Sequence, residues 1–235
     1  MLFWLCYVLD KDISLRTGQP PVIADQFCDL TLPEGYAQSR FLPHQPGQVQ
    51  NPWLPGDLRL SLLKSKAVQS LYSNASLRKS DAELLKTIRE LDEELEGWRI
   101  SIPEGFSPTL SVRKDVRLAE DTTISRSMLL IELHLDYHFL LNTIHCASGR
   151  CVTRESNDPQ HHSFGVQSSF DLSVEASRST IVYLSASANR LAGEAFWYVF
   201  YTELTPSNSI MLSAITVLSR PNNSSGSLYF TRCRH

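Results

Sequence analysis

The sequence predicts an all-α protein, a multi-helix bundle with long irregular loops. Apolar residues recur at three- and four-residue spacing in several separate segments of the 235-residue chain, which is typical of amphipathic helices. No alternating pattern is long enough to indicate a sheet, and no internal repeat of fixed period is found. With 42% hydrophobic residues, the chain is long enough to bury a substantial core.

The first predicted helix begins with the chain and ends at Gly18, because glycine suits a left-handed cap. Two prolines follow at once and cannot continue a helix. Its apolar residues Leu2, Leu5, Leu9 and Ile13 recur at helical spacing and are expected to form one stripe on a face of this helix. Residues 19–56 contain seven prolines and predict an extended connection over the surface.

A second helix is expected to open at Gly56 and Asp57, with a buried face made of Leu58, Leu62, Leu63, Val68, Leu71 and Tyr72. A third begins with Ser80 and Glu83, the spacing of a capping box, and ends before Pro103. Its apolar seam follows at spacings of four and three: Leu84, Ile88, Leu91, Leu95 and Trp98. The opposite face carries charges of both signs and is expected to be solvated.

The segment 125–146 is apolar on most sides, which predicts a helix in the middle of the bundle, closed by Gly149. Residues 104–124 are expected to be irregular, and the polar stretch 153–169 is expected to be a loop. Helical patterns resume over about 170–191 and recur in 193–204 and 207–221. Residues 222–235 show no amphipathic period and predict a disordered tail.

Composition excludes several classes of function. With 22 Lys and Arg against 25 Asp and Glu, the chain has no basic surplus for an autonomous DNA-binding module. Its five cysteines (Cys6, Cys28, Cys146, Cys151 and Cys233) form no Cys-x-x-Cys pair, which indicates free thiols in a reducing compartment. Apart from the short apolar opening, which runs directly into Asp10, Lys11 and Asp12, no segment approaches the roughly 18 uninterrupted apolar residues of a membrane span.

One cluster has spacing that a metal could use. His134 and His138 lie four residues apart on a predicted helix, as a zinc pair requires, with Glu132, Asp136, His145 and Cys146 nearby. The Glu-bearing H-E-x-x-H form is absent, and histidines on a buried helix are usually hydrogen-bonded core residues. We therefore assign no metal ligand and no catalytic residue, and expect the chain not to be an enzyme. Asp12 and Arg16, also four apart, are expected to pair.

Four aromatic residues crowd into five positions of the predicted helix 193–204, and they cannot all face one core. They could line a pocket between helices or a surface for a partner. These residues are Trp197, Tyr198, Phe200 and Tyr201.

The opening stretch "FWLCYVLDKDISLRTGQPPVIADQFCDLTLP" carries an ordered set of signature positions: Phe3, Trp4, Tyr7, Asp10, Lys11, Ser14, Arg16, Gly18, Pro20, Pro21, Asp25, Asp29 and Pro33. This set resembles the fungal-specific transcription factor domain of zinc binuclear cluster regulators, also called the middle homology region or xylanolytic-activator regulatory domain. Weaker similarity continues through Trp98, Ile102 and Pro103 and through the segment around His134 and His138. There Cys146 and Ala147 depart from the basic residue and proline of the family pattern.

The resemblance implies that residues 1–221 are the regulatory domain of a nuclear transcription regulator, incomplete at its N-terminus, with 222–235 as the disordered tail. The six-cysteine zinc cluster that reads DNA in such proteins is missing, so we expect DNA to be reached only through that N-terminal domain and no cofactor in this chain. Expected partners are a homo- or heterodimer with related regulators, co-regulators and a small-molecule effector, with no membrane.

Two alternatives stay open. The first is a headless dominant-negative partner of related regulators, in which Met1 is the true start and not a gene-model truncation. The second, of another class, is an all-α metal-binding protein or enzyme built around His134 and His138.

Overall fold

The structure, a computed structural model, describes residues 2–41, 56–111, 124–154 and 164–191. The described residues form helices and irregular connections without a strand, which confirms the all-α fold class. The longer helices are α1 (Leu2–Thr17), α3 (Leu58–Ala67), α4 (Asp81–Ser101), α5 (Ile124–Cys146) and α7 (Phe164–Leu191). Shorter ones are α2 (Tyr36–Ser39) and α6 (Gly149–Arg154), with single turns at Asp25–Phe27 and Ser76–Arg78 and a π-helical turn at Val68–Tyr72.

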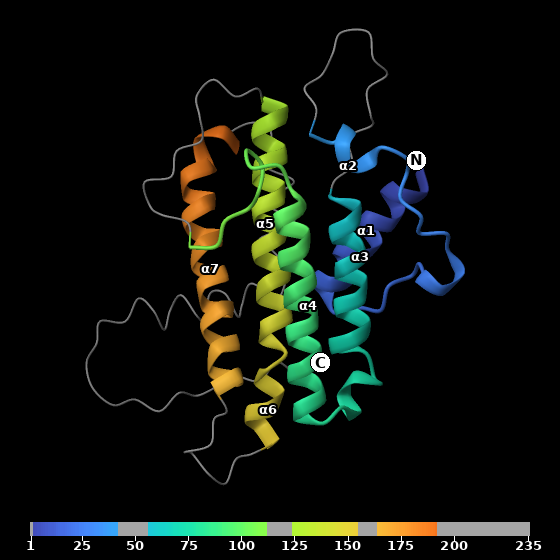
Figure 1. Cartoon of the computed structure of the whole chain (residues 1–235), viewed down its shortest axis with the longest axis vertical. Coiled ribbons are helices and arrows are strands. Elements are labelled where there is room, and N and C mark those ends of the chain that lie inside the picture. The colour runs from blue at the N-terminus through green and yellow to red at the C-terminus, as the bar shows by residue number, and fades with distance from the viewer. Residues whose placement is uncertain (1, 42–55, 112–123, 155–163, 192–235) are drawn as a thin grey trace, which may run out of the picture.

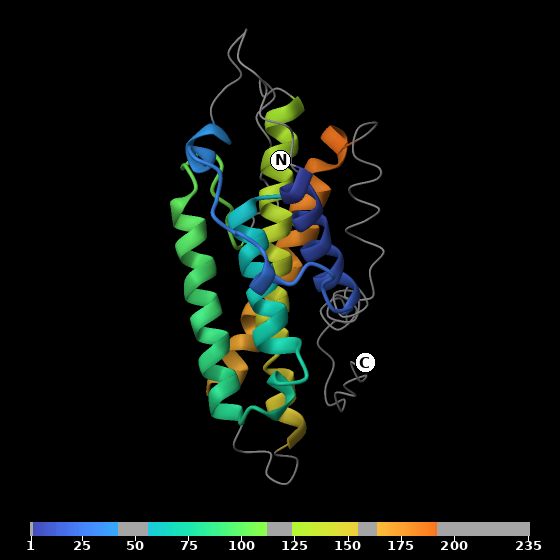
Figure 2. The same cartoon turned by 90° about the vertical axis from the view of Figure 1, so that its right-hand side faces the viewer.

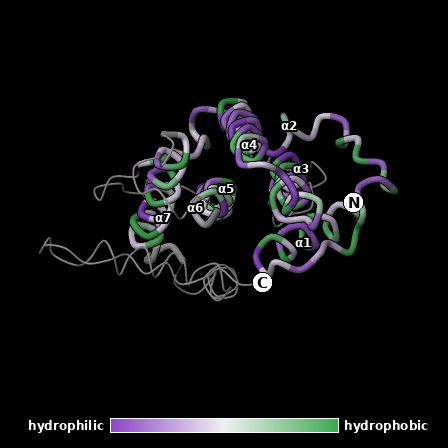
Figure 3. The backbone as a smooth tube through the Cα atoms, turned by 90° about the horizontal axis from the view of Figure 1, so that it is seen from below, coloured by the Kyte–Doolittle hydropathy of each residue, from purple (hydrophilic) through white to green (hydrophobic). Residues whose placement is uncertain are grey.

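Helices α3, α4, α5 and α7 run along the long axis of the bundle and alternate in direction (Figure 1). Seen end-on, α5 lies in the middle, with α7 and α4 around it and α1 at the edge of the bundle beside α3 (Figure 3). Helix α5 is buried along most of its length, as its apolar sequence predicts. None of the helices in the described ranges is long and apolar enough to cross a membrane.

Local signals explain the end of α1 and the starts of α3 and α4. Gly18 follows α1 with a φ of 70°, and its N–H donates to the Ser14 carbonyl. The Asp57 carboxylate caps α3 by accepting from the amides of Arg59 and Leu60. The capping box of Ser80 and Glu83 at α4 is confirmed.

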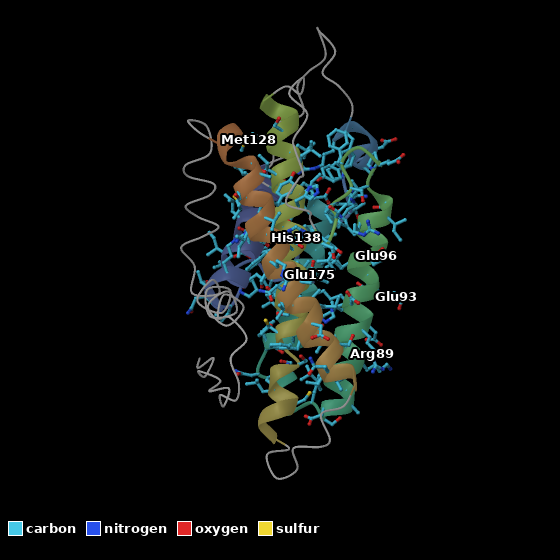
Figure 4. The ribbon with its side chains drawn as sticks, turned by 90° about the vertical axis from the view of Figure 1, so that its left-hand side faces the viewer. Arg89, Glu93, Glu96, Met128, His138 and Glu175 are labelled. Atoms are coloured by element: carbon cyan, nitrogen blue, oxygen red, sulfur yellow. The ribbon has the colours of Figure 1, made fainter. Side chains whose placement is uncertain are left out.

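The seam of α4 forms the centre of the core as predicted, because all five of its residues are at most 5% exposed. Trp98 of this seam stacks on Tyr137 of α5 with ring centroids 6.4 Å apart. On the opposite face, Arg89 and Glu93 project away from the bundle (Figure 4), which confirms the expected solvated surface.

The apolar stripe predicted on α1 does not face the core. Leu2, Leu9 and Ile13 are 73%, 43% and 43% exposed, and Leu5 is only partly buried. The buried face instead holds Trp4, Tyr7, Val8, Lys11, Ser14, Leu15 and Arg16. Helical spacing identifies a stripe but not its direction, and here charged groups with partners on other elements turn inward.

Several other expectations need correction. In the second helix Leu60 is buried, whereas Leu62 and Leu63 are partly buried and Tyr72 is 45% exposed. Gly149 begins α6 and does not close α5, which ends at Cys146. The predicted loop 153–169 is too long, because α6 reaches Arg154 and α7 begins at Phe164. The predicted helices 193–204 and 207–221 and the tail lie outside the described residues.

A close approach between α1 and the start of α3 provides a test of the packing. A Cβ atom added to Gly56 would lie 2.7 Å from Val8 Cγ1, nearer than two carbon atoms can pack. We expect Gly56→Ala to destabilise the protein by about 1–3 kcal/mol, as overpacking in a core does. Urea unfolding followed by circular dichroism measures the change.

Gly97→Ala is the matched control, because an added Cβ at this position in α4 meets nothing within 4 Å. Alanine is the better helix former, so this variant should gain about 0.5–1 kcal/mol. Equal stability changes in the two variants would contradict the close packing of α1 on Gly56.

Candidate functional site

Ten charged side chains gather where α1, α3, α5 and the connection 19–41 meet, and we call them the ionic network. Its four cations are almost inaccessible, with exposed side-chain fractions of 1% for Lys11, 4% for Arg16, 9% for Arg40 and 1% for Lys64. Its carboxylates are Asp10, Asp12, Asp25, Asp57, Glu132 and Asp136. Buried charges are tolerated only when they are paired, so these contacts determine how the helices fit together.

The centre of the ionic network joins three helices. Lys64 Nζ of α3 lies 2.9 Å from Asp12 Oδ1 of α1 and 2.9 Å from Asp136 Oδ2 of α5. Arg16 contacts the other oxygens of the same carboxylates, with Nε 2.8 Å from Asp12 Oδ2 and Nη2 3.3 Å from Asp136 Oδ1. The predicted pair of Asp12 and Arg16 is therefore confirmed, as part of a larger arrangement.

This pairing shifts the pKa values of Asp12 and Lys64. Burial opposes the ionisation of Asp12, but Lys64 and Arg16 outweigh it and hold the pKa of Asp12 well below its usual range. Burial likewise disfavours the ammonium of Lys64, yet Asp12 and Asp136 raise its pKa. The Arg16 guanidinium also covers the Phe139 ring of α5, 4.3 Å from its centroid.

A second part of the network attaches the connection 19–41 to α1. Lys11 Nζ lies 3.2 Å from Asp10 Oδ2 and 3.0 Å from Asp25 Oδ1, and it donates to the Ile23 carbonyl. The hydroxyls of Tyr7 and Ser65 donate to Asp25 over 3.1 and 2.6 Å. The Asp10 carboxylate accepts from the amides of Val22 and Ile23. The proline-rich segment thus has a defined path, although its sequence predicts no regular element.

A third part lies at the N-terminus of α3. Arg40 Nη2 is 2.6 Å from Glu132 Oε1, and Arg40 Nε is 3.6 Å from Asp57 Oδ2. Asp57 also accepts from the Trp98 indole over 3.3 Å, so it connects the α3 cap to the α4 seam. Burial raises the pKa of Glu132 to about 7, and the attraction of Arg40 offsets only part of that effect.

The signature positions divide into groups. Asp10, Lys11, Arg16 and Asp25 belong to the ionic network, and Tyr7 donates to it. Others shape the backbone: Ser14 Oγ donates to the Gln19 carbonyl over 2.6 Å, and Gly18 ends α1. Trp4 is buried against Tyr7, whereas Phe3 is 38% exposed. The remaining four lie in the connection, exposed or partly buried: Pro20, Pro21, Asp29 and Pro33.

Half of the network was not recognised in the sequence as a set of partners. The sequence places Asp57 at the start of a helix and Glu132 and Asp136 beside the histidines, and it predicts no partner for Arg40 or Lys64. One signal was available, since Lys64, Glu132 and Asp136 are charged residues on otherwise apolar helix faces. Which of these charged residues pair cannot be predicted from the sequence, because partners such as Arg16 and Asp136 are 120 positions apart.

The two histidines of α5 lie inside the bundle, with His138 among the helices in Figure 4. His134 Nδ1 donates to the Leu130 carbonyl over 2.9 Å, and its ring stacks on Tyr183 of α7 at 4.2 Å. His138 Nε2 donates to the Thr109 carbonyl over 2.8 Å. Burial lowers the pKa of both imidazoles to about 4. This geometry favours the interpretation as core residues.

No group of three or more His, Cys, Asp or Glu side chains in the described ranges is arranged to hold a metal ion. The aromatic group Trp197, Tyr198, Phe200 and Tyr201 lies outside the described residues, so its expected role as pocket or partner surface stays a prediction. The ionic network can fix the helices relative to one another. Its charged groups pair with other residues of the same fold.

Fold and site together define an all-α module whose helices are joined by buried ion pairs. The family model described as "Fungal specific transcription factor domain" matches residues 1–100, which hold the signature and most of the network. This match confirms the resemblance of the opening stretch to that domain.

The similar proteins are fungal transcription regulators. An "ABC-transporter-regulating transcription factor" of Aspergillus fumigatus is 36% identical over 161 residues, which cover 66% of this chain and 17% of that protein. Its namesake in Aspergillus oryzae matches with the same identity and coverage. A transcriptional regulatory protein of Schizosaccharomyces pombe is 30% identical over 123 residues, 47% of this chain and 19% of the relative. The chain thus spans less than a fifth of these relatives, and no solved structure matches it.

The central pairing predicts a large effect from one substitution. Lys64→Met leaves the carboxylates of Asp136, which is buried, and Asp12, which is 23% exposed, with Arg16 as their remaining cation. Breaking a buried ion pair by removing one partner costs about 3–5 kcal/mol, and we expect a loss of stability in that range. Urea unfolding at pH 7 measures it.

Lys66→Met is the matched control, since this side chain on the same helix is 52% exposed and pairs with Glu94 at the surface. A surface change of this kind should alter stability by at most about 0.5 kcal/mol. Similar losses in both variants would show that lysine substitution in α3, and not the central pairing, is what matters.

The raised pKa of Glu132 predicts how the stability of the protein depends on pH. Its folded pKa of about 7 lies above the ordinary glutamate value of 4.5, so its contribution to stability is present below the unfolded pKa and is lost as the pH rises through 7. Glu132→Gln cannot ionise, and we expect it to gain about 2–3 kcal/mol relative to wild type between about pH 5 and pH 8.

Denaturant titrations at several pH values measure this difference, with the exposed Glu93→Gln as a control that should follow wild type. A constant stability difference between Glu132→Gln and wild type across that pH range would contradict a raised pKa for Glu132.

Proposed function

We propose that the chain is the regulatory region of a fungal transcription factor, and that it controls DNA-templated transcription in the nucleus without catalytic activity. The observation that carries the proposal is the coincidence of the family match over residues 1–100 with a signature whose charged residues build the ionic network. DNA is contacted by a zinc-cluster domain outside this sequence. A net charge of −3 gives these residues no electrostatic affinity for phosphates of their own.

The ionic network supports a mechanical role for the module. Lys64, Asp12 and Asp136 lie on three different helices, so a force on one helix is transmitted to the other two. Such a body can present a surface to a co-regulator, a related regulator or a small-molecule effector, and relay that contact to the DNA-binding domain. Because two relatives are named for regulating ABC transporters, we include ABC-transporter genes among the targets.

The alternative of a metal-binding protein or enzyme around His134 and His138 has less support. One nitrogen of each ring donates to a backbone carbonyl, and the ring centroids are 6.2 Å apart with planes at 76°. No described residue supplies a third ligand beside them.

A tethering experiment tests the proposed function. The full chain is fused to an unrelated DNA-binding domain in a fungal host that carries a reporter gene with the matching operator. We expect the fusion to raise or lower reporter expression relative to the DNA-binding domain alone. The fusion with Lys64→Met should lose the effect, and the fusion with Lys66→Met should keep it.

An unchanged reporter at full protein level would contradict the proposal. So would a nanomolar, salt-dependent shift of duplex DNA by the chain alone, because it would place DNA binding within these residues.

A further inference from the structure

The outward face of α1 is apolar. Leu2 is 73% exposed, Leu9 and Ile13 are each 43% exposed, and Cys6 is exposed as well. At 3.6 residues per turn these four side chains share one narrow stripe, which we call the α1 stripe. It lies opposite the buried face that holds Trp4, Val8, Lys11 and Leu15. Helix α1 lies at the edge of the bundle (Figure 3), and no other described helix covers this stripe.

The α1 stripe has the pattern of a helix-packing seam. Its members are spaced four, three and four residues apart, as in a seam that contacts a second helix. None of them is charged, whereas the outer face of α4 carries Arg89, Glu90 and Glu93. A solvated helix face is expected to resemble that of α4, so the α1 stripe indicates a surface that another segment covers.

A segment with matching character lies in the chain itself. Residues 192–235 follow the last described residue of α7, and within them 208–219 ("NSIMLSAITVLS") contains no charged residue. As a helix it would place six of its seven apolar residues on one side, and Leu212 on the other. The six are Ile210, Met211, Ala214, Ile215, Val217 and Leu218. Such a helix would be about 18 Å long, close to the length of α1 that the stripe occupies.

The segment can reach α1 without strain. Residues 192–207 separate it from α7. With 193–204 as the helix that the sequence predicts, this linker would span about 30 Å, of which about 18 Å is helix. The C-terminal end of α7 and the N-terminal end of α1 lie toward the same end of the long axis (Figure 1, Figure 2). A segment that leaves α7 there can turn and run beside α1.

We propose that residues 208–219 form an amphipathic helix that packs on the α1 stripe of the same chain. A second copy is a poorer occupant. Four side chains of this size bury on the order of 400 Å² per partner, whereas a stable interface needs about 800 Å². A tethered segment needs less area, because the linker holds it at an effective concentration of about 1 mM. This inference concerns how α1 is covered and does not depend on the proposed function.

Cys6 reports directly on the occupant, because its thiol lies in the middle of the stripe. The full chain is treated with a maleimide, and the labelling rate of each cysteine is followed by peptide mass spectrometry. We expect Cys6 in wild type to react about tenfold more slowly than in Ile215→Asp, since a buried carboxylate would displace the segment. Thr216→Asp, on the opposite side of the predicted helix, should leave the rate unchanged.

Cys151, which is 4% exposed within the bundle, provides the folding control and should stay slow in all three proteins. Equal, fast labelling of Cys6 in wild type and Ile215→Asp would overturn the proposal. So would protection of Cys6 that disappears on dilution, because it would identify a second copy as the occupant.

A crosslinking measurement needs no destabilising substitution. Benzoylphenylalanine replaces Leu9, which is already 43% exposed, and is activated by light in the full chain. We expect crosslinks within one chain to residues 208–219, at a yield that does not change with protein concentration. Crosslinks between chains, or to residues outside 208–219, would contradict the assignment.

Discussion

The placement of the helices depends on Lys64 and the two carboxylates that it joins. Its ammonium lies 2.9 Å from an oxygen of Asp12 and of Asp136, while Arg16 contacts the other oxygen of each. Two cations and two anions therefore compensate one another; three of the four side chains are at most 5% exposed, and that of Asp12 is 23% exposed. Removal of these charges from water is costly, and their attraction offsets that cost only at this geometry. The relative positions of α1, α3 and α5 follow from that requirement.

The same requirement explains the unusual polarity of α1. Lys11, Ser14 and Arg16 must turn inward to reach their partners, which lie on the connection 19–41 and on α5. Because these polar residues occupy the inward face of α1, the aliphatic residues at the other positions lie on its outward face. The exposed apolar face of α1 is thus a consequence of its charged interior. A further segment on that face would give α1 partners on both sides.

The sequence predicted best what depends on neighbours in the chain. The capping box and seam of α4, the burial of α5 and the glycine stop of α1 all follow from residues a few positions apart. The direction in which the α1 stripe faces does not follow from such residues, because it is decided by ion pairs such as that of Arg16 with Asp136, 120 positions away. The candidate site divides in the same way: its signature half was recognised from order along one segment, whereas the partners on α3 and α5 could be identified only in three dimensions.

The structural roles of the signature residues limit which parts of the surface can bind a co-regulator or an effector. Asp10, Lys11, Arg16 and Asp25 are each occupied by a partner within the fold, and Gly18 and Ser14 hold the turn that follows α1. Lys11 and Arg16 are buried and paired, so they cannot also contact a co-regulator or an effector, and the partly exposed Asp10 and Asp25 already accept from partners within the fold. The signature therefore identifies the architecture of the module and not its ligand. Specific recognition must come from residues that the ionic network leaves accessible, on the outer faces of the helices and in the connections between them.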